Sequence, residues 1–212
     1  MISVKRLVKD LDSGLILIPE RYDPRRIQET SGVRLGDLVL SAKESLIPAK
    51  ASEDLMVLVL DTGDADRGLL APKNYPIPAR EIGSNKKLIE SGDVLISRLR
   101  PYLRQIAYIP NGLSAEGIGM ACSTEFFVLR STSDSSIAFL VHWLLDEKTQ
   151  EVLRVGQEGG HHPRFTEEHL LNLTVPEQVL SNRDGLSREV ERASNLNIDA
   201  MKILGSFPIS NY

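Results

Sequence analysis

Short apolar runs, each closed by turn-forming residues, occupy the middle of the chain. Asp61-Thr-Gly-Asp64 follows one of them, and Pro110-Asn-Gly112 follows another. Runs this short between turn residues are typical of β-strands, because a helix needs a longer periodic segment. Several strands at close spacing predict a curved mixed β-sheet, with strands over residues 55–60, 93–97, 105–109 and 124–129.

Beyond residue 136 the apolar residues follow a helical spacing instead. The pattern predicts one helix over residues 137–155, with a stop at Gly156. Its candidate caps are Asp134, Ser135 and Ser136. A short helix should open near Thr166, and a short strand should follow over residues 171–175. Strands and helices together predict an α+β fold, a curved mixed sheet with flanking helices.

The C-terminal segment carries a narrower apolar seam at coiled-coil spacing. Its positions hold Leu186, Val190, Ala193, Asn197, Ala200 and Leu204. We expect a helix over about residues 184–204, roughly 30 Å long. This helix either packs on its own domain or pairs with a partner chain as a spacer or dimerisation helix, with Asn197 fixing the register. The chain then divides into a domain over residues 1–178 and a segment over 179–212.

Composition restricts the class of protein. Hydrophobic residues make up 42% of the 212, enough for one sizeable core. Cys122 is the single cysteine, so an internal disulfide and a cysteine-rich zinc site are excluded and a cytoplasmic protein is expected. No apolar run is long enough to cross a bilayer, and the apolar residues 15–18 are too few for a secretory signal.

The net charge of −4 counts against a free-standing DNA-binding protein, which usually has a basic balance. The sequence pI is about 5.6. A local basic surface, or a partner that supplies most phosphate contacts, would remove this objection.

Three stretches in chain order form a set. The first is Arg34-Leu-Gly-Asp-Leu-Val39. The second is Ile89-Glu-Ser-Gly-Asp-Val-Leu-Ile-Ser-Arg98, followed by Gln105-Ile-Ala-Tyr-Ile109. The third extends from the helix at 137–155 through Gly159-Gly-His-His-Pro-Arg164 to Val175-Pro-Glu-Gln178. Together they resemble the target-recognition domain of the specificity-subunit family of type I restriction–modification systems, over nearly the whole chain.

Two departures from the family pattern are visible. The joint at 175–178 is shorter than the usual proline-rich joint, and the helix after it is delayed to about residue 184. Full specificity subunits carry two recognition domains and two spacer helices, whereas this chain has room for one of each. It therefore resembles a half-subunit, or one half of a longer protein. A half-subunit has to dimerise to read a two-part site.

The resemblance implies a non-catalytic protein that reads double-stranded DNA in phage defence. Methyltransferase subunits would supply S-adenosylmethionine and catalysis, and a restriction subunit is a further implied partner. The chain fits this division, because it contains no Asn-Pro-Pro-Tyr motif, no Gly-x-Gly-x-x-Gly loop and no Gly-Lys-Ser/Thr phosphate loop.

Residues 86–104 are the strongest candidate for DNA contact. Two negative residues, Glu90 and Asp93, are outnumbered there by Lys86, Lys87, Arg98, Arg100 and Arg104. On an extended chain Arg98 and Arg100 would share a face, and Pro101 would place them at a rim. Arginine can fork onto guanine O6 and N7 or onto a phosphate, and Tyr102 could stack on a base. The alternative is a solvated turn with ordinary salt bridges.

The glycine-rich loop is a second candidate. Its glycines let backbone amides approach phosphates, and His161, His162 and Arg164 can then donate hydrogen bonds. The alternative is a plain connecting turn with Arg164 paired to Glu167 or Glu168. A third, weaker candidate combines residues 22–26 with Lys43 and Lys50.

Other functions have less support in the sequence. His161, His162 and His169 do not have the spacing of a His-Glu-x-x-His zinc helix. Cys122 opens an apolar strand and should be packed rather than nucleophilic. The acidic cluster at residues 61–66 has no Glu-x-Lys partner strand, which argues against a nuclease. A protein-interaction adaptor that uses its C-terminal helix and binds no DNA is the remaining alternative.

Overall fold

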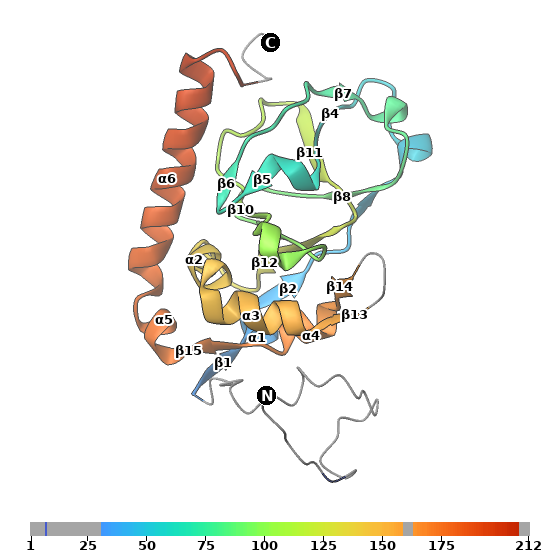
Figure 1. The fold of residues 1–212 in the computed structure, drawn as a ribbon. Helices are drawn as coiled ribbons and strands as arrows, with labels where there is room; N and C mark the ends of the chain where they lie inside the picture. The colour runs from blue at the N-terminus through green and yellow to red at the C-terminus, as the bar shows by residue number, and fades with distance from the viewer. Residues whose placement is uncertain (1–6, 8–30, 159–162, 208–212) are drawn as a thin grey trace.

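The computed structural model describes residue 7, residues 31–158 and residues 163–207. Within these described residues, two larger β-sheets, three small two-stranded sheets and several helices form an α+β fold (Figure 1). The predicted fold class is confirmed. The strands, however, form several sheets rather than a single curved one, because three separate apolar cores of the described residues divide them, two of which are large.

The four-stranded sheet separates these two cores. All of its strands are antiparallel, and their order is β10 (Ile106–Tyr108), β9 (Val94–Ser97), β12 (Phe126–Ser131) and β2 (Val39–Ser41). Successive side chains of a strand point to opposite faces, so Val94 and Ile96 pack in one core and Leu95 packs in the other. Burial on both faces explains why the first three residues of β9, Val94-Leu95-Ile96, are all apolar.

The five-stranded sheet covers the second core. Its order is β3 (Ser45–Leu46), β8 (Lys86–Leu88), β11 (Ile118–Cys122), β4 (Met56–Leu60) and β7 (Ile77–Pro78). β11 and β4 are parallel and the other pairs antiparallel, so this sheet is mixed, as predicted. β11 was not predicted, because its sequence Ile-Gly-Met-Ala-Cys is poor in β-branched residues.

The predicted helix over residues 137–155 is wrong in one respect, because it is two helices. They are α2 (Phe139–Leu145) and α3 (Glu147–Val155), separated at Asp146. Asp146 has an extended backbone, and its carboxylate accepts a hydrogen bond of 2.9 Å from the Lys148 amide. Aspartate is a preferred N-cap residue, and this local bond starts α3. Gly156 is the C-cap of α3, as expected.

The expected caps do not cap α2, because its N-cap is Ala138 and no side-chain cap hydrogen bond is formed there. The hydroxyl of Ser136 accepts a hydrogen bond of 3.2 Å from the Ala138 amide, and no such bond of Asp134 or Ser135 is seen with the described residues. α4 (Glu167–Leu171) starts where predicted, because the Thr166 hydroxyl accepts from the His169 amide at 3.1 Å. The strand predicted over 171–175 is β15 (Thr174–Pro176), since α4 extends through residue 171.

Short elements complete the fold. β15 pairs with β1 (Gly32–Arg34), which leads into α1 (Leu35–Leu38). Two hairpins are formed by β5 (Ala65–Asp66) with β6 (Leu69–Leu70) and by β13 (Gln157–Glu158) with β14 (Arg164–Phe165). The short 3-10 turns are η3 (Pro48–Lys50), η4 (Thr62–Asp64), η5 (Ala79–Glu81) and η6 (Pro101–Leu103).

The C-terminal helix packs on the rest of the domain along one flank. α5 (Glu177–Ser181) fills the expected delay before α6 (Arg183–Ile203). The Phe139 amide of α2 donates to the Ser187 hydroxyl at 3.2 Å, and the Asn197 side chain donates to the Leu70 carbonyl at 2.6 Å. Ile198 is buried in the second core. None of the helices in the described ranges has the length and apolar character needed to cross a membrane.

The predicted seam of α6 is not a single contact face. Leu186 and Val190 pack against the first core, whereas Ala193, Ala200 and Leu204 are exposed. The helix carries apolar side chains over a wider arc than one seam, and the domain covers only one side of that arc. The outer side exposes Ala193, Leu196, Ala200 and Ile203, again at alternating steps of three and four. We call these four residues the outer stripe.

The Asp146 cap predicts a measurable stability effect. Asp146→Ala removes the acceptor for the first amides of α3 and should lower the free energy of unfolding by about 0.5–2 kcal/mol. Asp146→Asn keeps a cap of similar strength and should lose much less. Urea denaturation of both variants measures the difference, and equal stabilities of Asp146→Ala and the wild type would contradict this account of the helix break.

Candidate nucleic-acid interface

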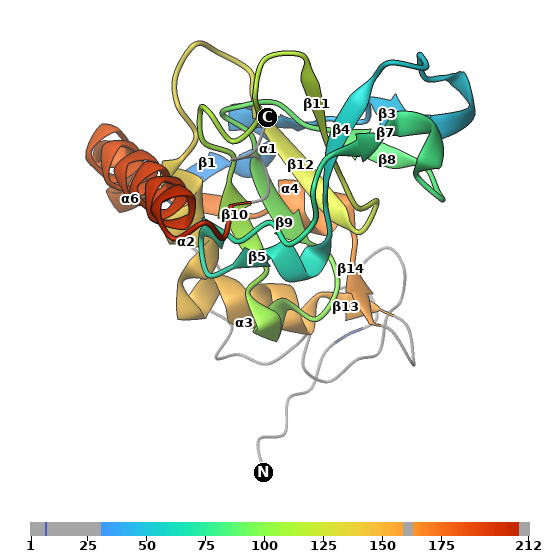
Figure 2. The ribbon, with the colours of Figure 1, turned by 90° about the horizontal axis from the view of Figure 1, so that it is seen from above.

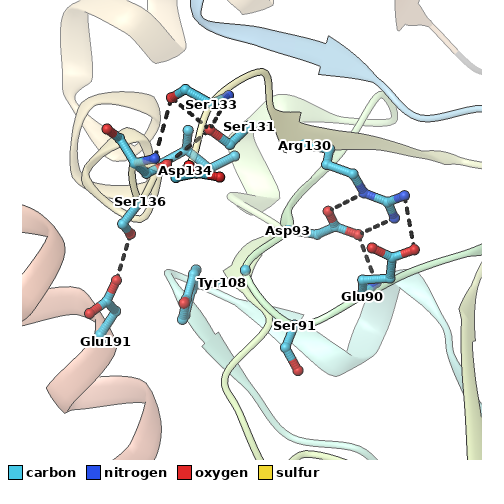
Figure 3. Close-up of a pocket in the computed structure, with 13 residues that line it drawn as sticks. Glu90, Ser91, Asp93, Tyr108, Arg130, Ser131, Ser133, Asp134, Ser136 and Glu191 are labelled. Carbon is cyan, nitrogen blue, oxygen red and sulfur yellow. Dashed lines mark hydrogen bonds and ion pairs between the residues drawn. The ribbon is translucent and has the colours of Figure 1, made fainter.

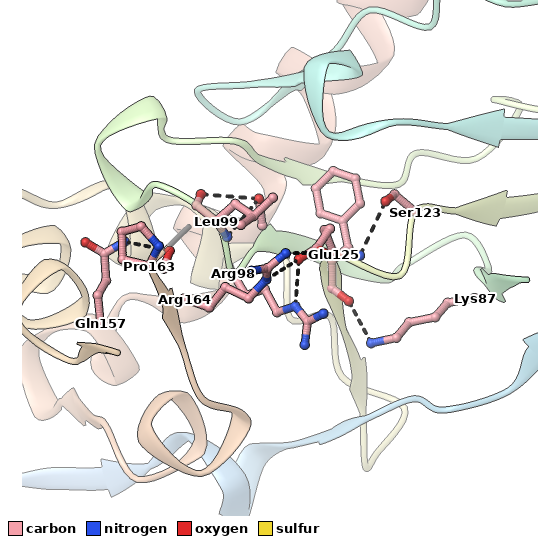
Figure 4. Close-up of polar contacts among 10 residues, drawn as sticks. Lys87, Arg98, Leu99, Ser123, Glu125, Gln157, Pro163 and Arg164 are labelled. Atoms are coloured by element: carbon pink, nitrogen blue, oxygen red, sulfur yellow. Dashed lines mark hydrogen bonds and ion pairs between the residues drawn. The ribbon is translucent and has the colours of Figure 1, made fainter. Parts of the chain in front are cut away.

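Two of the predicted arginines share one carboxylate. Arg98 Nε lies 2.8 Å from Glu125 Oε2, and Arg164 Nη2 lies 2.8 Å from Glu125 Oε1 (Figure 4). Arg164 Nε also donates to Glu125 Oε2, at 3.0 Å, so this pair is bidentate. We call Arg98, Glu125 and Arg164 the arginine clamp. The structure thus brings together two candidates that are far apart in the sequence, and Glu125 was not predicted.

Backbone hydrogen bonds place the three residues of the arginine clamp. The Arg98 amide donates to the Glu125 carbonyl at 3.0 Å, one step beyond the last β9–β12 pair. The Phe165 amide donates to the Arg98 carbonyl at 3.3 Å, which joins β14 to the end of β9. The clamp is therefore built at the place where the buried central strand reaches the surface.

Electrostatics within the arginine clamp stabilise the ionised carboxylate. The hydrogen bonds from Arg164, followed by those from Arg98, lower the pKa of Glu125 to about 2, although burial opposes this shift. The side chains of Arg98 and Arg164 remain 35% and 39% exposed. Arg98 uses Nε for Glu125, and no partner of its two Nη nitrogens is seen among the described residues. Those nitrogens keep donors for a ligand.

Both predicted lysines form hydrogen bonds within the chain. Lys87 of β8 donates from Nζ to the Phe126 carbonyl at 2.7 Å and lies 5.5 Å from the centre of the Phe127 ring. Burial lowers the pKa of Lys87. Lys86 donates to the Ser84 hydroxyl at 3.1 Å. DNA contact by Lys86 and Lys87 stays a prediction, and for Lys87 it requires release of the backbone carbonyl.

The turn after β9 differs from the extended geometry that we expected. The strand ends at Ser97, and Arg100 has a left-handed backbone with φ of 45°. The rule that alternate side chains share a face therefore does not extend from Arg98 to Arg100. Arg100 and Tyr102 are exposed, while Arg104 forms an ion pair with Glu147 of α3. Pro101 begins η6, so the chain does turn where proline predicted it.

Some candidates of the sequence lie outside the described residues. His161, His162 and residues 22–26 belong to this group. Arg164 pairs with Glu125, a partner that the sequence did not suggest; Glu167 instead pairs with Lys43 at 3.2 Å. Lys50 ends η3 and is exposed.

The alternative sites show ordinary structural contacts. Burial raises the pKa of Cys122 to about 12, so its thiol stays protonated and is a poor nucleophile. Asp64 accepts a hydrogen bond of 2.7 Å from the Asp61 amide within a turn. The His169 ring lies against the Val152 carbonyl, at 3.2 Å. In residues 31–158 and 163–207, no three His, Cys, Asp or Glu residues are arranged to hold a metal ion.

A polar pocket of about 330 Å³ lies beside α6 (Figure 3). Arg130 donates to both carboxylate oxygens of the buried Asp93, at 2.9 Å each, and this contact raises the pKa of Arg130 above its ordinary value. Glu90 accepts a third bond from Arg130, at 3.1 Å. The walls also include Asp134 and Glu191, so carboxylates outnumber the single arginine. This excess makes the pocket a poor site for phosphate.

At least two solved structures have a fold similar to that of this chain. One is a chain of a structure described as the basis of complex assembly and conformational transition of the type I system, with 24% identity and a TM-score of 0.57. It matches 82% of this chain and 46% of that chain. The structural similarity therefore shows that this chain has the α+β fold of that solved chain.

The description of the second structure names the subunit. It is the HsdS subunit from Thermoanaerobacter tengcongensis, with 26% identity, a TM-score of 0.54, and the same coverage of 82% and 46%. The expected resemblance to type I specificity subunits is thus confirmed, and the chain spans about half the length of the solved chains it matches. No family model and no curated protein matches the sequence.

The arginine clamp predicts a pH-dependent contribution to stability. The pKa of Glu125 is about 2 in the folded protein, below its usual value of 4.5, so its stabilisation is complete above pH 4.5 and is lost as the pH falls toward 2. Glu125→Gln should cost about 1–2 kcal/mol at pH 7. The difference from the wild type should vanish near pH 2.

Urea denaturation at several pH values measures this difference. Glu53→Gln is the control, because Glu53 also pairs with an arginine, Arg80, but is 77% exposed. An exposed pair of this kind contributes little at any pH. A Glu125→Gln effect that does not change between pH 7 and pH 2 would show that ionisation of Glu125 is not its source.

Proposed function

We propose that this chain recognises a short sequence in double-stranded DNA for a type I-like methyltransferase complex. The arginine clamp is the observation that carries the proposal. Glu125 holds the Arg98 guanidinium by one nitrogen and leaves the two Nη nitrogens available. A guanidinium in a fixed orientation can fork onto guanine O6 and N7, which is the commonest specific base contact in the major groove.

Pre-organisation explains why a carboxylate belongs in a DNA-binding surface. A free arginine loses rotamer entropy when it binds, and an arginine already held by a neighbour loses less. Two arginines on one carboxylate also keep a net positive charge of one, so the arginine clamp still attracts DNA. Arg164 brings the end of the glycine-rich loop to the same place, since it opens β14.

Division of labour with other subunits accounts for the acidic net charge. Phosphate contacts dominate the affinity of DNA-binding proteins and need not all come from the chain that reads the bases. In the proposed complex a methyltransferase subunit binds S-adenosylmethionine and catalyses transfer, a restriction subunit can join, and this chain carries out no catalysis. The similarity to chains from type I systems supports these partners.

A salt titration separates this function from an adaptor without DNA affinity. Fluorescence anisotropy with a labelled duplex of about 30 base pairs, from about 50 to 200 mM salt, should show binding that weakens steeply as salt increases. An adaptor gives no binding at any salt concentration, and that result would overturn the proposal.

Removal of one arginine tests the arginine clamp directly. Arg98→Ala leaves Arg164 on Glu125 and should keep the fold, but should weaken binding to a preferred duplex by about 1–3 kcal/mol. Arg192→Ala is the matched control, since Arg192 is exposed on α6, which lies on the opposite side of the molecule from β14 (Figures 1 and 2). Equal affinities of the Arg98 and Arg192 variants would remove the clamp from the interface.

The outer stripe of α6 supports a second element of the proposal, which is helix pairing with a partner subunit or a second copy. Leu196 and Ile203 are 58% and 84% exposed, and their spacing fits a coiled-coil seam. The proposed contact face therefore keeps only Ala193 and Ala200 of the predicted seam and adds Leu196 and Ile203. Asn197 donates to Leu70 of its own domain, so the proposed pairing uses no register contact by Asn197.

Charges on the outer stripe should abolish this pairing. Leu196→Glu combined with Ile203→Glu leaves the inner flank of α6 intact, so the domain should stay folded while association is lost. Light scattering after size exclusion measures the mass of the chain alone and with a methyltransferase subunit. If the double substitution changes neither the mass of the chain alone nor the mass of its complex with the methyltransferase subunit, the stripe is not an interface.

A further inference from the structure

Left-handed backbone conformations outside glycine occur at three described residues, and all three are arginines. Arg67, Arg100 and Arg104 have φ values of 45°, 45° and 51°. A residue with a Cβ atom is disfavoured in this region, whereas glycine adopts it at no steric cost and asparagine at a reduced one. Backbone preference therefore does not explain why arginine occupies all three positions.

The three arginines belong to two turns that are bonded to each other. Arg67 and Gly68 form the two-residue tip of the β5–β6 hairpin, and both have positive φ. The Arg67 amide donates to the Arg104 carbonyl at 3.0 Å, and the Gly68 amide donates to the Ile106 carbonyl at 2.8 Å. The hairpin tip is thus fixed against the end of the Arg100–Arg104 turn.

Side chains of the two turns remain available at the surface. Arg67 and Arg100 are exposed, and neither guanidinium has a hydrogen bond or ion pair with a residue in 31–158 or 163–207. Asp66 precedes Arg67 but forms no ion pair with it. Tyr102 is 64% exposed and Leu69 39% exposed beside them. Arginine with an exposed aromatic ring suits the sugar–phosphate backbone of a nucleic acid.

Residues in unfavourable backbone regions tend to occur at functional sites, where the surrounding structure holds them in the strained conformation. A two-residue hairpin tip with both φ values positive favours Asn-Gly or Gly-Gly over Arg-Gly. The charged side chain is what Arg67 supplies and these alternatives lack. The sequence analysis did not include Arg67, because its location beside Arg104 depends on the fold.

We propose that Arg67 and Arg100 form a second DNA contact, which binds backbone phosphates and positions the duplex for the arginine clamp. This inference rests on the proposed function, since it assumes that the chain binds double-stranded DNA. Phosphate contacts set the register and orientation of a duplex, while base contacts specify the sequence. The two turns would therefore contribute affinity and salt dependence rather than base preference.

Arg67→Gly separates the functional role from a structural one. Glycine relieves the left-handed backbone, so the urea midpoint should stay equal or rise. Binding of a random-sequence duplex should nevertheless weaken severalfold, and the slope of log affinity against log salt should become shallower by about 0.9 for one lost phosphate contact. Arg67→Lys keeps the charge and should retain the wild-type slope. Arg192→Ala serves again as the neutral control.

The outcomes distinguish this inference from the proposed function. If Arg98→Ala weakens preferred binding and Arg67→Gly changes neither affinity nor slope, the phosphate contact is overturned and the arginine clamp stands. If the wild-type chain binds no duplex at all, the proposed function itself fails. If Arg67→Gly leaves DNA binding intact but weakens association with a methyltransferase subunit, the two turns bind protein, and the inference is again overturned.

Discussion

The central strand β9 is buried on both faces, and the remainder of the molecule is arranged around this constraint. Its alternate side chains enter two different cores, one covered by helices α2 to α4 and the other by the five-stranded sheet and α6. A strand in this position cannot slip in register without exchanging the two cores. Arg98 follows β9 immediately, so its backbone position is as fixed as the core itself.

A rigid strand that ends at the surface suits recognition better than a flexible loop. The Arg98 guanidinium is oriented by Glu125, which is itself fixed by the register of β12 with β9. Arg100 and Arg67 stand on turns bonded to the next strand, β10. Arg98 and Arg100 thus follow the end of β9, and Arg67 lies on a hairpin tip whose neighbouring residue Gly68 bonds to β10. Local arrangement, rather than the net charge of −4, decides whether this surface attracts a polyanion.

The sequence predicted features that depend on neighbouring residues. The strands near residues 56–60, 94–97 and 106–108, the start of α4 and the long C-terminal helix follow from period, capping and turn chemistry. The break at Asp146 was missed because a single cap outweighed a continuous helical pattern. Glu125 was missed because its partners are 27 and 39 residues away. Arg67 was missed for the same reason, since a hairpin tip gains its neighbours only when the sheets form.

Selection of DNA sequences from a random duplex pool tests the central claim most directly. The chain, with a methyltransferase subunit where one is required for tight binding, is used to enrich duplexes over several rounds. The account predicts one short enriched motif containing a guanine whose preference disappears in Arg98→Ala. Enrichment of no motif by a folded, DNA-bound protein would contradict it, because binding would then depend on phosphates alone.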